Sequence, residues 1–166
     1  MSGRRPIALG LAVAVAVSAS AGSPFSSVAD SFVALFPAPP SVQRRSVSLA
    51  GAGSVSLRMY RVDEPETQWL IGAANVAGLA LDPRRTLSAA RTAVVERSGG
   101  ALTSERPVRI GHYDGLELRL QRPDKAVVRA RVCVTPRRIF EVIVITAEEA
   151  RRQPQIERFM ESFFPE

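Results

Sequence analysis

Hydrophobic residues occupy both faces of one stretch, Arg137 to Thr146, near the C-terminal end of the chain. Its apolar residues form two alternating sets, Ile139, Ile143 and Ile145 in one and Phe140, Val142 and Val144 in the other. A β-branched run of this kind is typical of a strand that is covered on both sides. The stretch therefore predicts a central strand, with Glu141 as the one charge inside its apolar run.

Strict alternation of apolar and polar residues predicts half-buried strands elsewhere. Two such runs, Ser46–Leu49 and Ser54–Tyr60, flank the turn Gly51-Ala52-Gly53 and predict a hairpin. Further strands are predicted at Ser31–Phe36 and Gln68–Val76. Three more runs precede the central strand, at Leu102–Ile110, Leu116–Gln121 and Val128–Val134. The turns at Gly111–Gly115, Pro123-Asp124 and Pro136-Arg137 are short, so these strands are expected to be antiparallel neighbours.

Two helices complete the pattern. Asp82-Pro83 supplies a cap and a first-turn proline, and Gly99-Gly100 ends that helix. The final helix is expected to begin near Pro154, after a loop over Ala147–Gln153. Its apolar stripe falls at helical spacing, at Ile156, Phe159, Met160 and Phe163. We expect this stripe to cover the sheet, and the alternative is an exposed docking helix. The fold class is α+β: an antiparallel β-sheet with an N-terminal hairpin, flanked by two helices, in one domain over residues 31–166.

The N-terminus has the three parts of a secretory signal peptide. Arg4 and Arg5 form a basic start, Ile7–Val17 is an apolar core, and Ala19-Ser20-Ala21 offers a cleavage site. Residues 1–21 are therefore predicted to be a signal peptide, and the Ser-rich residues 22–30 a flexible lead. Export to the periplasm or the exterior follows, with no stable membrane span after cleavage. The alternative is an uncleaved N-terminal anchor, although the apolar core is shorter than a spanning helix requires.

The charge pattern argues against a nucleic-acid partner. Residues 1–21 hold two arginines and no acid, so the rest of the chain has 20 basic and 16 acidic residues, a net charge of +4. Arginine pairs recur along the chain, at positions 44–45, 84–85, 137–138 and 151–152. A nucleic-acid footprint would gather basic residues on one face. Spread as they are, these pairs are expected to be solvated strand ends and turns.

The order of elements resembles the PsbP-like superfamily. The matching pieces are Phe36-Pro37 before an early turn, the turn Gly111–Gly115 before Leu116-Glu117-Leu118, and the terminal Glu161-Ser162-Phe163. The resemblance covers Phe32–Phe164. That superfamily includes the extrinsic P subunit of photosystem II, a Ran-binding nuclear-import factor and many exported bacterial proteins. It implies an antiparallel sheet sandwiched by helices, in a binding, assembly or chaperone role, and brings no shared catalytic residues. No photosystem-specific segment is present, so that function is not transferred.

Few residues offer catalytic or metal chemistry. His112 is the only histidine and Cys133 the only cysteine, so neither a zinc site nor an internal disulfide is expected. Cys133 lies in an apolar run and is predicted to be a core residue. His112 lies in a glycine-bounded turn, where a structural role is the more common one. We expect no catalytic residues, no metal and no cofactor.

Glu141 has two interpretations. In a central strand an acid must be paired or neutral, and Arg129 and Arg131 on the preceding strand are the predicted partners. An active carboxylate is the alternative. The aromatic residues Trp69 and Tyr60, as partly exposed anchors, and His112 and Tyr113 in the turn are the candidate partner-binding residues. Core packing is the alternative for Trp69.

These observations favour a non-enzymatic, exported binding or assembly module of the bacterial cell envelope. Its partner is expected to be another envelope protein. The alternative is a small-molecule or lipid carrier with a pocket between the sheet and the terminal helix. An enlarged apolar cavity there would favour the carrier.

Overall fold

The computed structural model describes residues 22–49 and 53–166. The predicted signal peptide, residues 1–21, lies outside the described residues, as do Gly51 and Ala52 of the predicted hairpin turn. Within these ranges the chain forms two helices and ten strands.

The main feature is a seven-stranded sheet in which every neighbouring pair is antiparallel. Its strands, in spatial order, are β3 (Ser41–Leu49), β4 (Gly53–Glu64), β5 (Thr67–Asn75), β9 (Arg138–Thr146), β8 (Val127–Val134), β7 (Tyr113–Gln121) and β6 (Ala101–Ile110). The strand predicted to be central is β9, and it does lie in the middle, between β5 and β8. The predicted hairpin is β3–β4, and the predicted meander is β6–β9.

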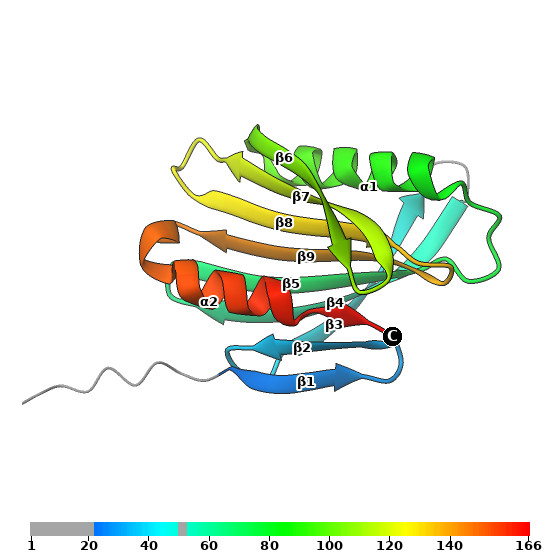
Figure 1. Ribbon diagram of the computed structural model, residues 1–166, viewed down its shortest axis with the longest axis horizontal. Helices are drawn as coiled ribbons and strands as arrows, with labels where there is room; N and C mark the ends of the chain where they lie inside the picture. Colours follow the sequence, from blue (N-terminus) through cyan, green and yellow to red (C-terminus); the bar gives the residue numbers. More distant parts are fainter. Residues whose placement is uncertain (1–21, 50–52) are drawn as a thin grey trace, which may run out of the picture.

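The sheet is covered on both faces, which accounts for the two apolar sides of β9 (Figure 1). Helix α1 (Pro83–Ser98) packs on one face, over Val128, Ala130 and Ile139. Helix α2 (Glu149–Ser162) packs on the other face, over Phe140 and Val142. A small sheet, β1 (Ser23–Ser27), β2 (Phe32–Phe36) and β10 (Phe164–Pro165), extends the layer that contains α2. The predicted α+β class, with an antiparallel sheet between helices, is confirmed.

Helix α1 follows the sequence prediction. Asp82 is the N-cap, and its Oδ1 accepts a hydrogen bond from the Arg85 backbone N–H at 2.7 Å. Pro83 occupies the first turn, where the missing N–H removes no helical bond. Gly99 ends the helix with φ of 63°, a left-handed conformation that glycine adopts without strain.

Helix α2 begins earlier than predicted. Its first residue is Glu149, so Pro154 lies inside the helix and the expected loop over Ala147–Gln153 is wrong. Pro154 is the sixth residue of the helix and has no N–H, so the bond to the Ala150 carbonyl, four residues earlier, is absent. The apolar stripe is buried as predicted, since Ile156, Phe159, Met160 and Phe163 are each at most 4% exposed.

The predicted flexible lead over residues 22–30 is also wrong. Ser23–Ser27 forms β1, which pairs with β2 from Ser23 opposite Phe36 to Ser27 opposite Phe32. Phe25 anchors the strand, with its ring centroid 5.7 Å from that of Phe36 and 5.4 Å from that of Tyr60. The Ser-rich composition conceals the strand, because β1 needs only this one aromatic anchor to pair with its neighbour.

Candidate functional site

Two of the predicted partner-binding residues, Trp69 and Tyr60, belong to the core. Trp69 is 1% exposed and Tyr60 is 3% exposed, so neither is a surface anchor, and the alternative of core packing for Trp69 is confirmed. The Trp69 ring packs edge-on against Phe159, and its Nε1 donates a hydrogen bond to Glu64 Oε2 at 3.1 Å. Both residues lie on the α2 side of the sheet, where β4 and β5 are covered by α2 and the small sheet.

The Tyr60 hydroxyl ties the small sheet to the large one. It donates to Asp30 Oδ2 at 2.6 Å and lies 2.6 Å from Ser27 Oγ. Asp30 also accepts from Arg58 Nη1 at 3.1 Å and from Arg138 Nε at 3.3 Å. Burial, and then the bond to Asp30, raise the pKa of Tyr60 above its usual value. The β1–β2 turn is therefore fixed by a buried polar cluster.

The other two candidates, His112 and Tyr113, lie at the end of the sheet where β6 turns into β7. The turn is shorter than predicted, because Tyr113 already begins β7. Gly111 has φ of 57° and lies beneath the Phe164 ring, where an added Cβ would come within 3.2 Å of that ring. The His112 ring is exposed and packs edge-on against Phe164 at 6.0 Å between centroids.

Two cavities open at this end, and they share Tyr113, Thr135 and Pro136. The first, which we call the apolar groove, measures about 570 Å³. Its other lining residues are Val76, Leu79, Ala80, Leu81, Pro83, Arg84, Leu87, His112, Asp114 and Val134. The second, which we call the polar groove, measures about 540 Å³. Its other lining residues are Val28, Ala29, Asp30, Ser31, Asn75, Ala77, Arg137, Arg138, Phe140 and Glu166.

Exposed apolar side chains gather at the same end. Only four large hydrophobic residues in the described ranges are strongly exposed. Val28, at 90%, lines the polar groove, and Leu79, at 37%, lines the apolar groove. Phe164, at 41%, contacts the His112 ring beside the apolar groove. The fourth, Val42, lies on β3 and outside both grooves.

Each groove also presents one unpaired arginine. Arg84 lines the apolar groove and Arg137 lines the polar groove, and both are exposed. Neither forms an ion pair with a carboxylate among the described residues, unlike Arg138, which is bound to Asp30. Exposed apolar side chains beside a free guanidinium give this end the character of a binding surface.

Glu141 is paired, but not with the predicted residues. Its Oε2 lies 2.5 Å from Nη2 of Arg97, which comes from the last turn of α1. Arg129 and Arg131 are wrong as partners because Glu141 stands opposite Val132 in the register, so both arginines point to the other face of the sheet. The ion-pair interpretation of Glu141 holds, with a helical partner in place of a strand partner.

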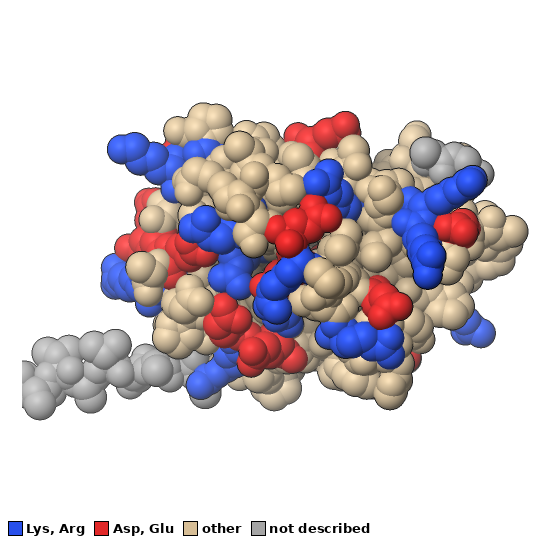
Figure 2. All heavy atoms as spheres, turned by 45° about the horizontal axis from the view of Figure 1, so that its top comes forward, with Lys and Arg blue, Asp and Glu red and all other residues tan. Residues whose placement is uncertain are grey.

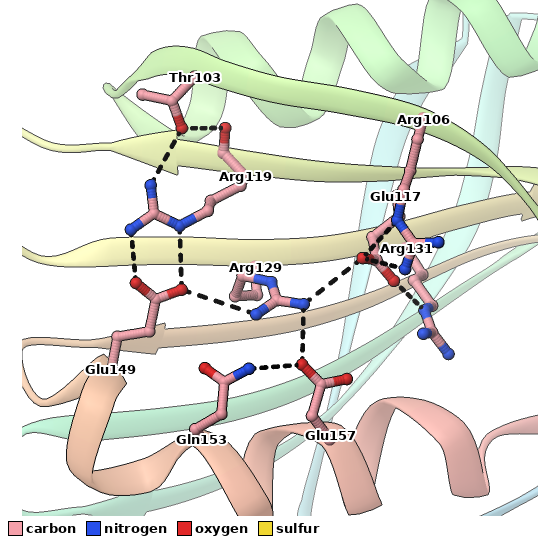
Figure 3. A network of polar contacts seen from close by, with 9 residues as sticks. All are labelled: Thr103, Arg106, Glu117, Arg119, Arg129, Arg131, Glu149, Gln153 and Glu157. Atoms are coloured by element: carbon pink, nitrogen blue, oxygen red, sulfur yellow. Dashed lines mark hydrogen bonds and ion pairs between the residues drawn. The ribbon is translucent and has the colours of Figure 1, made fainter.

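Arg129 and Arg131 instead belong to a network on the α2 side (Figure 3). Its centre is Glu117, which is 7% exposed. Glu117 accepts from Arg131 Nε at 2.7 Å, from Arg106 Nη2 at 2.7 Å and from Arg129 Nη2 at 3.4 Å. Burial raises the pKa of the Glu117 carboxyl, but the bonds from Arg131 and Arg106 outweigh it, and the net pKa is lowered.

The network continues onto α2. Arg129 also approaches Glu157 Oε1 at 3.2 Å, and Arg119 donates to Glu149 through two nitrogens. The bond from Arg119 is the main reason that the pKa of Glu149 is lowered. This network was not predicted from the sequence. A signal for it was present, because charged residues alternate with apolar ones in two neighbouring predicted strands. One strand carries Glu117 and Arg119, and the next carries Arg129 and Arg131.

The remaining chemical candidates are enclosed. Cys133 is fully buried, as predicted for a core residue, and burial raises the pKa of its thiol to about 12. Among residues 22–49 and 53–166, no three histidine, cysteine, aspartate or glutamate side chains are grouped so that they could hold a metal ion. None of the helices described here is both long enough and apolar enough to cross a membrane.

The surface charges do not form a nucleic-acid footprint on the face in view. Figure 2 shows arginines and acids interspersed across that face, with no broad area of one sign. Many of the arginines are held in ion pairs, such as Arg91 with Glu105 and Arg109 with Asp114. A nucleic acid requires an unneutralised basic surface, so this face does not suit one.

The cavity predicted for a carrier, between the sheet and the terminal helix, is very small. A space of about 30 Å³ lies there, lined by residues that include Trp69, Gln155 and Phe159. That volume is near the size of one water molecule, so a lipid does not fit. A cavity of ligand size with a mainly apolar lining lies in a different place, beside the start of α1.

Comparison with known proteins supports the fold. No protein-family model matches the sequence, and no curated protein matches it. The structure is similar to that of cyanobacterial PsbP (CyanoP) from Synechocystis sp. PCC 6803, with a TM-score of 0.56 and 16% identity, over 95% of this chain and 99% of that one. A protein of unknown function from Pseudomonas aeruginosa, PA94, matches with a TM-score of 0.46 and 13% identity, over 75% of this chain and 98% of that one. The chain therefore has a PsbP-like fold, as its sequence predicted.

Proposed function

We propose that the protein is an exported, non-enzymatic module that binds another protein of the bacterial cell envelope. The binding surface is the end of the sheet that carries the two grooves and the shared residues Tyr113, Thr135 and Pro136. The observation that carries this proposal is the clustering of exposed apolar side chains. Val28, Leu79 and Phe164 lie at or beside these grooves. Apolar side chains gathered at one place and bordered by polar residues mark interaction sites on soluble proteins.

The state of the reactive residues supports a non-enzymatic role. Glu141, the acid in the central strand, is neutralised by Arg97 and is not directed into either groove. The Cys133 thiol is enclosed, and its pKa of about 12 keeps it protonated at neutral pH. His112 lines the apolar groove, with Asp114 also in that lining. Asp114, however, is paired with Arg109 at 2.7 Å, so it is not free to orient the imidazole.

Export rests on the sequence of residues 1–21, and the fold is compatible with their removal. The first strand, β1, starts at Ser23, which lies beyond the predicted cleavage site after Ala21. Cleavage after Ala21 would leave every described strand and helix intact. N-terminal sequencing of the mature protein should begin near Gly22. Intact Met1 on the protein recovered from the soluble cytoplasm would contradict export.

Site-specific photocrosslinking tests the binding surface. A photoreactive amino acid is placed at Val28 or at Leu79, on either side of the shared Tyr113, and at Ser104, an exposed residue of β6, as the matched control. We expect the first two positions to give the same crosslinked envelope protein in intact cells and Ser104 to give none. Equal labelling from all three positions, or no product from the groove positions, would contradict the proposal.

A small-molecule or lipid carrier is the second candidate, and the volume of the apolar groove favours it. About 570 Å³ lies within the range of ordinary ligand sites. Ala80 lines this groove and is exposed, so Ala80→Trp should fill it without disturbing the core. A carrier would yield a bound small molecule in native mass spectrometry, and Ala80→Trp would abolish it. A protein-binding module would yield the Val28 crosslink and no such molecule.

A further inference from the structure

We propose that the free edge of β3 is a second docking site, which accepts an extended acidic segment of a partner protein as an additional strand of the large sheet. This site is separate from the grooves and does not depend on the function proposed for them.

The edge of β3 is open to solvent. β3 is the outermost strand of the seven, paired on one side with β4. All six residues from Ser41 to Ser46 are exposed, and Val42 is 50% exposed. An outermost strand directs alternate N–H and C=O groups away from the sheet, where an extended peptide can pair with them.

The opposite edge of the sheet, formed by β6, is protected against pairing with another strand, whereas β3 is not. β6 is broken by a register shift between Leu102 and Ser104, and Pro107 removes one N–H. Its three charged residues, Glu105, Arg106 and Arg109, are all held in ion pairs. β3, in comparison, has an unbroken register of nine pairs with β4 and contains no proline.

The chemistry of the partner follows from Arg44 and Arg45. Both are exposed, and the only side-chain hydrogen bond of either in the described chain is from Arg45 Nη2 to Gln43 Oε1 at 3.4 Å. Neither has a carboxylate within ion-pair distance there. Residues 1–21 and 50–52 contain no aspartate or glutamate, so the rest of this chain supplies no acidic side chain either. Two neighbouring positive charges on an open edge favour an acidic partner strand.

A second copy of the chain is a poor occupant. Two β3 strands paired antiparallel about the Arg44–Arg45 peptide would place Arg44 opposite Arg45 twice, and pairing about the central residue would place the two Arg45 residues opposite one another. Like charges directly opposite one another destabilise a sheet. The incoming strand is therefore a different, acidic segment. In antiparallel register it reads acid, acid, polar, apolar, opposite Arg45, Arg44, Gln43 and Val42 respectively.

A synthetic peptide tests this pattern. The probe is a fluorescein-labelled nine-residue peptide with two adjacent glutamates followed by threonine and valine, and its counterpart has lysines in place of the glutamates. We expect the protein to bind the glutamate peptide at least about tenfold more tightly, because two cross-strand ion pairs are replaced by two repulsions. Hydrogen exchange should slow at alternate β3 amides when the peptide binds, because only those amides face the new strand.

Charge reversal gives the matched control. The double change Arg44→Glu and Arg45→Glu should lose the glutamate peptide and gain the lysine peptide. Arg151→Glu with Arg158→Glu changes two other exposed arginines, on α2 and outside both grooves, and should leave binding unchanged.

The proposal would be overturned by no binding up to about 1 mM peptide, by equal affinity for the two peptides, by unchanged exchange along β3, or by equally strong competition from disordered polyglutamate. Sedimentation that shows a dimer joined through β3 would also overturn it, in favour of a second copy.

Discussion

The Arg97 guanidinium, on the last turn of α1, lies 2.5 Å from Oε2 of Glu141 in the middle of the central strand. The side chain of Glu141 is 9% exposed, whereas that of Arg97 is 50% exposed. Arg97 therefore extends from the surface to the edge of the apolar layer between α1 and the sheet. There its positive charge compensates the negative charge of Glu141, which lies inside that layer. This single contact joins the C-terminal turn of α1 to the centre of the sheet.

Removal of Arg97 should destabilise the fold more than an ordinary surface change. In Arg97→Leu the Glu141 carboxylate loses its partner in a buried position, which typically costs about 1–3 kcal/mol or more for a charged group. Arg91→Leu is the control on the same helix, because Arg91 and its partner Glu105 are each about one-third exposed. Pairs of that kind contribute about 0–1 kcal/mol. Urea melts of the two variants measure the difference, and equal losses of stability would contradict it.

Glu141 also shows where sequence analysis reaches its limit. Alternation predicted β8, the run that is apolar on both faces predicted β9, and the short turn between them predicted that they are neighbours. The face of the sheet on which each side chain lies depends on the register between β8 and β9, in which Val134 stands opposite Ile139 and Arg131 stands opposite Val142. A shift of one residue would have placed Arg131 on the same face as Glu141. The pattern of residues does not specify the register. Arg129 and Arg131 were therefore predicted as partners of Glu141, although they lie on the opposite face of the sheet.

Elements with strong local signals were predictable, and the grooves were not. The Asp82-Pro83 cap and the two-sided apolar run of β9 are local features, and both predictions were confirmed. β1 was missed because its pairing depends on Phe25 contacting residues of β2 and β4. The grooves combine Val28, Leu79 and Tyr113 from distant segments, so only His112 and Tyr113 were found in advance, from their turn.

The network around Glu117 should make stability depend on pH in the acid range. The pKa of Glu117 is lower in the folded chain than its ordinary value of 4.5. Its stabilising contribution is therefore complete above the ordinary pKa and is lost as the pH falls through the lowered value. Glu117→Gln should cost about 3 kcal/mol at pH 7, since loss of one partner of a buried pair costs about 3–5 kcal/mol and Arg129 retains Glu157.

Denaturant melts across the pH range measure this dependence. The gap in stability between the parent protein and Glu117→Gln should narrow as the pH falls below the ordinary pKa of 4.5, because the Glu117 carboxyl then becomes protonated. Asp114→Asn is the control, because the Asp114 side chain is 85% exposed and pairs with Arg109 at the surface. A constant gap between the parent protein and Glu117→Gln at every pH would show that the lost stability does not come from ionisation.

Cys133 should be unreactive in the native protein. Its side chain is fully buried between β7 and β9, and burial raises its pKa to about 12. A thiol reagent that absorbs light on reaction should therefore detect no thiol at pH 8 and one thiol per chain in denaturant, since the sequence has one cysteine. Rapid reaction under native conditions would indicate that the core around β8 opens frequently.

Phe159 should be essential for stability, because it joins α2 to both sheets. Its ring packs against Trp69 of the large sheet at 5.3 Å and against Phe36 of the small sheet at 5.2 Å between centroids. It is 1% exposed, which excludes the alternative that this stripe is an exposed docking helix. Truncation of a buried phenylalanine to alanine typically costs about 3–5 kcal/mol.

That loss is large beside the total stability of a domain, about 5–15 kcal/mol. Phe159→Ala should lower the melting temperature by about 6–20 °C, at about 2–4 °C per kcal/mol. Phe164→Ala is the matched control, because Phe164 lies only five residues further on but is 41% exposed and contacts the turn at Gly111 and His112. Thermal melts followed by circular dichroism compare the two. If Phe164→Ala cost as much as Phe159→Ala, then the β10 contact with that turn, and not the packing of α2, would control the stability of the C-terminal segment.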